Sequence, residues 1–260
     1  RVARECGCRV GTTTNGMLCV EETPDRMVRE GLSIVGFSLA GTDESQDAIR
    51  RGTRLESVLR AITKLDEAKK RLGSSVPEIH VAYIWLNSQF EAVKQLPEVL
   101  EGTGVGQVVI STLDFVPHPT LAVECLQAND KVEETFLRGV MSQVLEDGRK
   151  RGLEIHCRFA TRLGPPGICT ENVTRALVVS SRGHVCPCVF RNVPIDENHR
   201  PGDNAPYTPP RLAFGDINRQ SLADIWRGKD YKAFRKTHAA GKGSDVCGPC
   251  TKLFCSAQIA

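Results

Sequence analysis

The sequence predicts an α/β protein with two parts, a body of parallel strands and helices over residues 1–160 and a small C-terminal module over residues 161–260. Three observations support this division. Apolar runs alternate with amphipathic stretches through the first part. The pattern changes after "RLGPPG" at 162–167. Six of the eleven cysteines lie between residues 169 and 255.

The composition is that of an ordinary globular chain. Of its 260 residues, 40% are hydrophobic and 25% charged, and the net charge of +3 is spread along the chain. No apolar run approaches the ~20 residues that span a bilayer, and no basic stripe points to nucleic acid. We therefore expect a soluble protein that binds neither membranes nor nucleic acid.

The cysteine content indicates a reducing compartment. The number of cysteines is odd, and no secretory segment opens the chain. A disulfide framework is therefore disfavoured, and thiolate–metal chemistry in the cytoplasm is the better interpretation.

In the first part, strands and helices alternate in order. We expect strands at 9–16, 33–41, 78–86 and 106–113, helices at 23–31, 54–72, 88–102 and 132–151, and a strand-like segment "LEIHCRF" at 153–159. Such alternation predicts parallel strands joined by right-handed crossovers, with the chemistry at the carboxyl ends of the strands. The segments at those ends are "TTNG", "SLAG", "LNS" and "STLDF".

In the second part, we expect a hairpin and a pair of helices. The hairpin, at 175–189, turns at Ser181–Gly183, and the helices, at 221–239, begin with Ser221 as N-cap. A polar loop rich in Pro and Gly, 194–210, lies between them. Because this module has few large apolar residues, we expect its cysteines to cross-link it through a metal.

Cys247-x-x-Cys250 has the spacing at which two thiolates bind one metal centre. Cys169 and one of the pair Cys186 and Cys188 are the obvious further ligands. A redox dithiol is disfavoured, because this motif does not follow a strand at a helix N-terminus. Structural zinc fits these ligand types equally well.

The remaining cysteines are scattered along the chain. Free cysteine is among the most buried residue types, so we expect these five side chains to be buried: Cys6, Cys8, Cys19, Cys125 and Cys157.

A set of motifs in a fixed order resembles the radical S-adenosylmethionine superfamily, in particular its members with a C-terminal SPASM or Twitch auxiliary-cluster domain. In the body these are "TTNG", "GLSIVGFSLAG", "DAIRRG" and "LESVLRAITKL", with Asn87 after the next strand. In the tail, Cys169 is followed by "GHVCPC", "FGDINRQSLADIW", "YKAFR" and "CGPC". Each motif is weak singly, and together they cover nearly the whole chain.

The resemblance implies a partial (β/α)6 TIM-like barrel that binds S-adenosylmethionine, and a [4Fe-4S] cluster that cleaves it to a 5′-deoxyadenosyl radical. It also implies that Ser38 and Arg50 contact the ribose or carboxylate of S-adenosylmethionine, and that Thr14 and Asn15 line the cavity. Thr14 and Asn15 are also good turn residues, and Arg50 could equally be a solvated helix residue.

The sequence departs from this family in two features of the body. It lacks the Cys-x-x-x-Cys-x-x-Cys motif that holds the catalytic cluster and the Gly-Gly-Glu-type segment after the second strand. Cys6 and Cys8 have the wrong spacing and precede a strand. The four strands match the third to sixth of the family, so we expect the first two βα units upstream of Arg1. The chain as given is expected to be inactive alone.

In the tail, the resemblance implies a single auxiliary [4Fe-4S] cluster of the Twitch type. Its expected ligands are Cys169, Cys188, Cys247 and Cys250, with Cys255 or Cys186 as a substitute.

The resemblance also implies a function for the parent protein. It would be a maturase that modifies a peptide or protein side chain and takes electrons from a reductant such as flavodoxin or ferredoxin. The alternative is a non-catalytic binding module that keeps a metal-stapled tail, with structural zinc as one occupant. For Asp114 and His118, the only role that we expect is to line the cavity.

Overall fold

A computed structural model describes residues 1–113, 119–161, 163, 169–193, 211–243, 245–247 and 250–253. These residues divide into two compact units. Unit 1 comprises the described residues of 1–113 and 132–159, and unit 2 those of 114–131 and 160–256. Asp114 and His118 lie outside the described residues.

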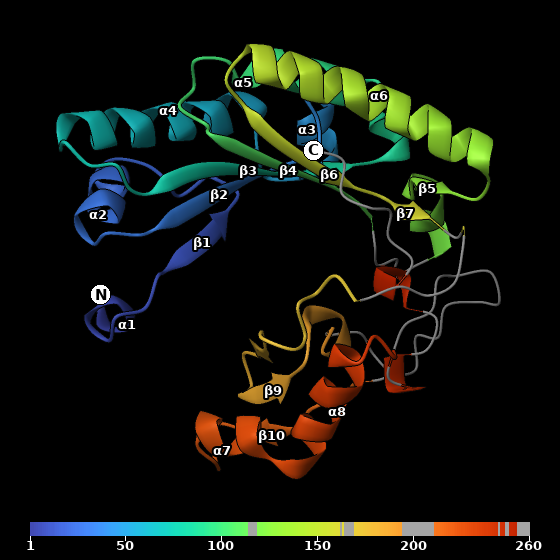
Figure 1. The fold of residues 1–260 in the computed structure, drawn as a ribbon. Helices are drawn as coiled ribbons and strands as arrows, with labels where there is room; N and C mark the ends of the chain where they lie inside the picture. Colours follow the sequence, from blue (N-terminus) through green and yellow to red (C-terminus); the bar gives the residue numbers. More distant parts are fainter. Residues whose placement is uncertain are drawn as a thin grey trace. The chain divides into compact units, whose positions relative to one another are not determined.

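Unit 1 is built on a five-stranded parallel sheet with the order β1-β2-β3-β4-β6 (Figure 1). Its strands are β1 (Gly11–Thr14), β2 (Ile34–Leu39), β3 (Glu78–Trp85), β4 (Gln107–Thr112) and β6 (Glu154–Arg158). Each pairs in parallel with its neighbour. The four expected strands are therefore present, and the strand-like segment at 153–159 supplies the fifth.

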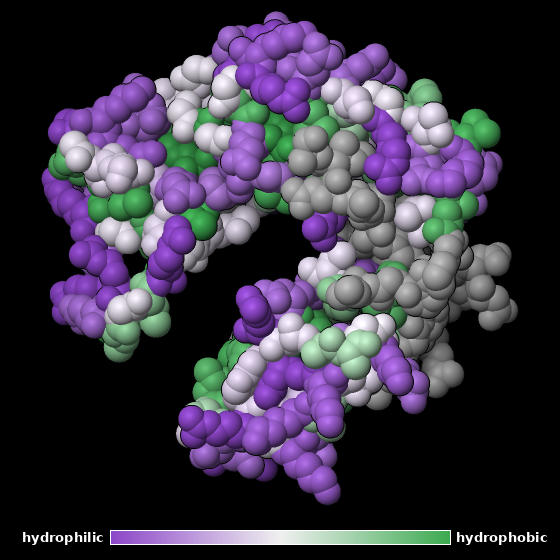
Figure 2. All heavy atoms as spheres, in the orientation of Figure 1, coloured by the Kyte–Doolittle hydropathy of each residue, from purple (hydrophilic) through white to green (hydrophobic). Residues whose placement is uncertain are grey.

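Helices cover one face of this sheet, where α4 (Leu55–Arg71), α5 (Leu96–Leu100) and α6 (Lys131–Lys150) lie in Figure 1. Alternate strand residues point to that face and are buried, as the period of two in a strand requires. The outward side of α6 is mainly hydrophilic (Figure 2). The core of unit 1 lies between sheet and helices, and its largest fully buried side chains include Trp85, Tyr83, Phe37, Phe159 and Leu39.

Three further short helices complete unit 1. They are α1 (Val2–Glu5), α2 (Thr23–Arg29) and α3 (Ser45–Ile49). Of these, α2 was expected from the sequence and packs against α4. The helices α1 and α3 were not expected, because neither is long enough to show a helical period.

The predicted helix at 88–102 is only partly correct. This segment forms two 3-10 turns, η1 (Asn87–Gln89) and η2 (Ala92–Gln95), before α5 begins at Leu96. Pro97 accounts for the interruption, because its ring would clash with the carbonyl of Val93 and it has no N–H to donate. At the first turn of a helix Pro is tolerated, and that is where it lies in α5.

Unit 2 contains a three-stranded antiparallel sheet with the order β10-β9-β8. The strands are β8 (Val178–Val179), β9 (His184–Cys186) and β10 (Gly215–Asp216). The expected hairpin is confirmed, since β8 pairs with β9 and Gly183 turns the chain with a φ of 88°. On the other side of β9, the segment "FGDIN" supplies β10.

The expected helix pair is also present, as α7 (Leu222–Arg227) and α8 (Lys229–Ala239). Ser221 caps α7, because its hydroxyl accepts a hydrogen bond from the backbone N–H of Asp224 at 3.1 Å. The buried core of this unit is small and consists of Val173, Val185, Ile225, Tyr231 and Phe234.

The remaining elements of unit 2 are short. They are η3 (Pro119–Glu124), β5 (Gln127–Ala128), β7 (Ala160–Thr161), η4 (Val189–Arg191), η5 (Asp245–Cys247) and η6 (Thr251–Leu253). Among the described residues, no helix is both long and apolar enough to cross a membrane.

Candidate metal centre

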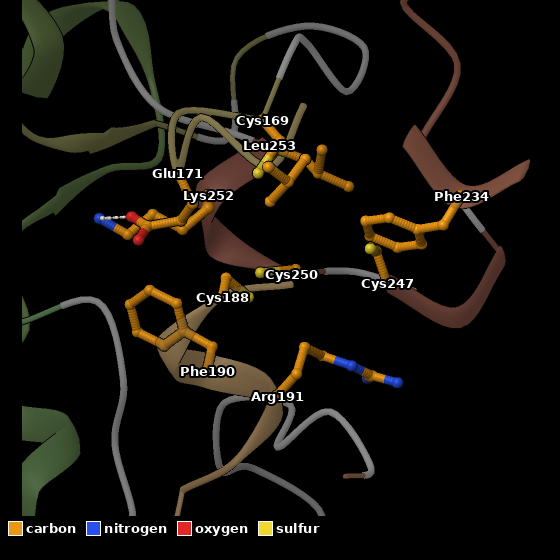
Figure 3. A pocket seen from close by; sticks show the side chains of 11 residues that line it. Cys169, Glu171, Cys188, Phe190, Arg191, Phe234, Cys247, Cys250, Lys252 and Leu253 are labelled. Carbon is orange, nitrogen blue, oxygen red and sulfur yellow. Dashed lines mark ion pairs between the residues drawn. The ribbon is translucent and has the colours of Figure 1, made fainter. Parts of the chain in front are cut away.

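Four thiols from three separate segments line one pocket of unit 2 (Figure 3). Cys169 precedes the sheet in the sequence, Cys188 follows β9, and Cys247 and Cys250 come after α8. The space among the lining side chains, counted with the part open to solvent, is about 380 Å³. The other lining residues are Glu171, Val173, Phe190, Arg191, Phe234, Lys252 and Leu253.

Backbone N–H groups serve three of these thiols. The sulfur of Cys169 accepts a hydrogen bond from the backbone of Glu171, that of Cys188 from Phe190, and that of Cys250 from Lys252. Each donor lies two residues after its cysteine, and Cys188, which precedes the turn η4, also accepts from the backbone of Arg191. Such bonds favour the thiolate form, which is the form that binds metals.

The fourth thiol contacts a buried histidine. The sulfur of Cys247 lies 3.5 Å from Nε2 of His238, a residue of α8 that is 6% exposed. The imidazole in turn packs on the ring of Phe234, with the ring centroids 4.5 Å apart. Cys247 is thus held against the small hydrophobic core of unit 2.

Burial opposes ionisation of the unliganded thiols. It raises the pKa of Cys169 to about 11 and that of Cys188 to about 12. Neighbouring thiolates raise both pKa values further, because the sulfurs are close enough to repel one another. Burial also raises the pKa of Cys250, although the positive charges of Lys252 and Arg191 oppose the shift. Burial therefore favours the protonated form of Cys169, Cys188 and Cys250.

The residues fit a metal–thiolate centre in their donor chemistry. Soft thiolate ligands select zinc and iron–sulfur clusters, and preformed N–H donors to sulfur are what such centres use to fix their ligands. The one carboxylate lining the described part of the pocket is Glu171, which is paired with Lys252 at 3.2 Å. Among the described residues, no three His, Cys, Asp or Glu side chains are grouped closely enough to hold a single metal ion.

Neither substitute ligand is among the described residues that line the pocket. Cys186 is fully buried on β9 and is not among the residues that line the pocket. Cys255 lies outside the described residues.

The expectation for the scattered cysteines is only partly correct. Cys19 and Cys157 are buried, and Cys125 is partly buried. Cys6 and Cys8 are exposed, so the expectation is wrong for them. They lie just after the short helix α1, which has no buried residue and so offers them no core to enter.

The residues expected near S-adenosylmethionine lie at the carboxyl ends of neighbouring strands. Thr14 ends β1 and is the register partner of Phe37 in β2. The residues that follow these two, Asn15 and Ser38, therefore lie at the same level of the two neighbouring strands. Thr14 and Asn15 also serve the turn, as their side-chain oxygens accept hydrogen bonds from the backbone of Gly16 and Met17. Both side chains therefore stabilise the turn that follows β1.

Arg50 lies at the end of α3 and is partly buried. Its Nε is buried and has no hydrogen-bond partner among the described residues. Arg50 is therefore not a fully solvated residue.

A buried glutamine that the sequence did not single out shapes the loop before Arg50. Gln46 is fully buried, and its Oε1 accepts a hydrogen bond from the backbone N–H of Ala40 at 2.6 Å. Gly41 allows this close approach, since a Cβ there would lie 2.7 Å from the backbone nitrogen of Gln46. The segment "SLAGTDESQ" predicts a loop after the strand, but it does not show that the side chain of Gln46 bonds back to Ala40.

Comparison with known proteins gives independent findings. Residues 169–251 match the model of the SPASM family, described as an iron-sulfur cluster-binding domain. Over 239 residues the chain is 25% identical to the tungsten-containing aldehyde ferredoxin oxidoreductase cofactor-modifying protein of Pyrococcus furiosus. That alignment covers 90% of this chain and 64% of the Pyrococcus protein.

Two solved structures share the fold. SuiB of Streptococcus suis bound to S-adenosylmethionine aligns with a TM-score of 0.61 and 13% identity, over 96% of this chain and 55% of SuiB. Native anSMEcpe with bound AdoMet and the Cp18Cys peptide aligns with a TM-score of 0.55 and 17% identity, over 95% of this chain and 64% of that one.

In each comparison this chain spans less than two thirds of its relative. The SPASM match begins at Cys169 and includes all four thiols that line the pocket. These findings confirm the resemblance to the SPASM family over residues 169–251, and they show that the chain shares the fold of two proteins solved with S-adenosylmethionine bound.

Proposed function

We propose that unit 2 holds an auxiliary [4Fe-4S] cluster through Cys169, Cys188, Cys247 and Cys250. The observation that carries this proposal is that four thiols, distant in sequence, line one pocket, each beside an N–H group or an imidazole. The SPASM match supports iron–sulfur over zinc as the occupant.

We further propose that unit 1 is part of a (β/α)6 barrel that binds S-adenosylmethionine. Ser38, Arg50, Thr14 and Asn15 would form its side of that site, because they gather at the carboxyl ends of β1 and β2 or in the loop that follows β2. The buried Nε of Arg50 is suited to donate to a carboxylate or hydroxyl oxygen.

The substrate of the whole protein is proposed to be a peptide or protein side chain. The relative that was solved with a bound peptide supports this, whereas the Pyrococcus relative is named as a cofactor-modifying protein. When bound, an iron–sulfur cluster supplies one-electron chemistry. The residues of unit 2 hold its ligands in place and bury them from bulk water, with a reductant such as flavodoxin or ferredoxin as the proposed electron donor.

Anaerobic reconstitution with iron and sulfide tests the cluster. We expect the chain to bind iron and sulfide and to absorb near ~400 nm, as thiolate-ligated clusters do. Cys188→Ala should lose both, because Cys188 lines the pocket. Cys186→Ala is the matched control, since Cys186 is buried two residues away but does not line the pocket.

Three results would contradict the proposal. Stoichiometric zinc with no iron would favour the metal-stapled binding module. Equal iron content in Cys188→Ala and in the wild type would remove Cys188 from the ligands. Equal loss in Cys186→Ala and Cys188→Ala would mean that the effect comes from the fold of the hairpin rather than from ligation.

A further inference from the structure

A buried arginine with no ion-pair partner among the described residues lines the pocket of the four thiols. Arg191 is 3% exposed, ends the turn η4 that Cys188 caps, and lines the same pocket (Figure 3). Its Nε and Nη1 are buried atoms, and neither has a hydrogen-bond partner among the described residues. No ion pair joins Arg191 to a described carboxylate.

This burial is costly unless something anionic is nearby. An arginine side chain stays protonated in proteins, and an isolated buried charge is strongly unfavourable. The carboxylate that lines the described pocket, Glu171, is already paired with Lys252. Among the described residues, the four thiols that line the pocket with Arg191 are the remaining source of negative charge there once a metal centre ionises them.

We propose that Arg191 is the built-in counter-charge of the metal–thiolate centre. The inference rests on the proposed function, because it needs the thiolates to be present. A thiolate-ligated cluster carries a net negative charge, and reduction adds one electron to it. A fixed positive charge therefore stabilises the reduced form more than the oxidised form and raises the reduction potential.

Lys252 also lines the pocket, but it is a weaker counter-charge than Arg191. Its ammonium is neutralised by Glu171 and lies 5.3 Å from the centroid of the Phe190 ring. Arg191 therefore provides the pocket with a positive charge that no described carboxylate cancels.

The test compares reduction potentials of reconstituted variants of the 260-residue chain. Arg191→Gln removes the charge and Arg191→Lys keeps it. Arg235→Gln is the matched control, because Arg235 lies in the same unit with a buried, unpartnered Nη1 but does not line the pocket. Iron content and melting temperature are measured first for each protein, and spectroelectrochemical titration follows.

We expect Arg191→Gln to lower the equilibrium constant for one-electron reduction roughly tenfold, which corresponds to about 59 mV. Arg191→Lys and Arg235→Gln should stay near the wild-type potential. If Arg191→Gln fails to assemble a cluster, Arg191→Lys decides alone, and a cluster with the wild-type potential in that variant supports the role of the charge.

Different results would overturn different claims. A wild-type chain without iron defeats the proposed function, and this inference with it. A complete cluster with an unchanged potential in Arg191→Gln defeats the inference alone. The same holds if Arg191→Lys shifts the potential as far as Arg191→Gln or loses the cluster, because shape rather than charge would then be responsible.

Discussion

At the scale of single residues, the cysteines fall into distinct environments that their spacing only partly indicates. Cys19 and Cys157 are buried and Cys6 and Cys8 are exposed. Burial raises the pKa of Cys157 to about 12 and also raises that of Cys19. The thiolate, not the thiol, is the nucleophile, so these two side chains are doubly protected, by lack of access and by protonation.

We therefore expect iodoacetamide at pH 8 to alkylate Cys6 and Cys8 in the native protein while Cys19 and Cys157 stay unmodified. Peptide mass spectrometry after a short reaction measures this. Unfolding in guanidinium should make all four equally reactive, which is the control for sequence effects. Rapid native modification of Cys157 would show that β6 opens far more readily than its burial indicates.

Sequence reasoning anticipated the residues at the site better than their electrostatic surroundings. The thiols were found because the Cys-x-x-Cys spacing and the crowding of cysteines are local signals. The roles of Arg191, His238 and Gln46 were missed, because a buried polar residue leaves no periodic trace in the sequence. Its burial results from elements that are distant along the chain.

At the scale of secondary-structure elements, long segments with a clear period were predictable and short ones were not. The strands at 33–41 and 78–86 and the helix at 54–72 combine an apolar period with a Gly or polar stop, and each is present. The segment 88–102 has helical composition, yet Pro97 divides it. Strands of two residues, such as β8 and β10, are set by pairing with β9 rather than by their own pattern.

The β8–β9 hairpin depends on Gly183 for two separable reasons. Its φ of 88° is unfavourable for other residues, and a Cβ there would lie 2.2 Å from Nδ2 of Asn218. Gly241 is a matched control, with a φ of 70° and no atom within 4 Å of the point that a Cβ would occupy. We expect Gly241→Ala to lower the free energy of unfolding by about 1 kcal/mol, from backbone strain alone.

Gly183→Ala should cost about 2–3 kcal/mol, because the displaced Asn218 side chain also loses its bond to the carbonyl of Arg182. Urea unfolding in a Trp85→Phe background, followed by the fluorescence of Trp226, measures both variants. Equal losses would mean that Asn218 moves aside freely and that only the backbone conformation matters.

At the scale of the whole molecule, the two units have unequal means of stabilisation. Unit 1 buries a continuous core between sheet and helices, whereas unit 2 has short strands around a small core. A domain with a small core commonly needs a metal or another cross-link. The metal centre should therefore contribute to the stability of unit 2 and leave that of unit 1 unchanged.

The two tryptophans of the chain allow this to be measured, because Trp85 lies in unit 1 and Trp226 in unit 2. Trp85→Phe leaves Trp226 as the reporter of unit 2, and Trp226→Phe leaves Trp85 as the reporter of unit 1. Removing the metal should lower the melting temperature reported by Trp226, since a ligand present at 100 times its dissociation constant stabilises the folded state by about 2.7 kcal/mol. The transition reported by Trp85 should not move. Equal shifts of both transitions would show that the units unfold as one, and an unchanged Trp226 transition would show that unit 2 is stable without its metal.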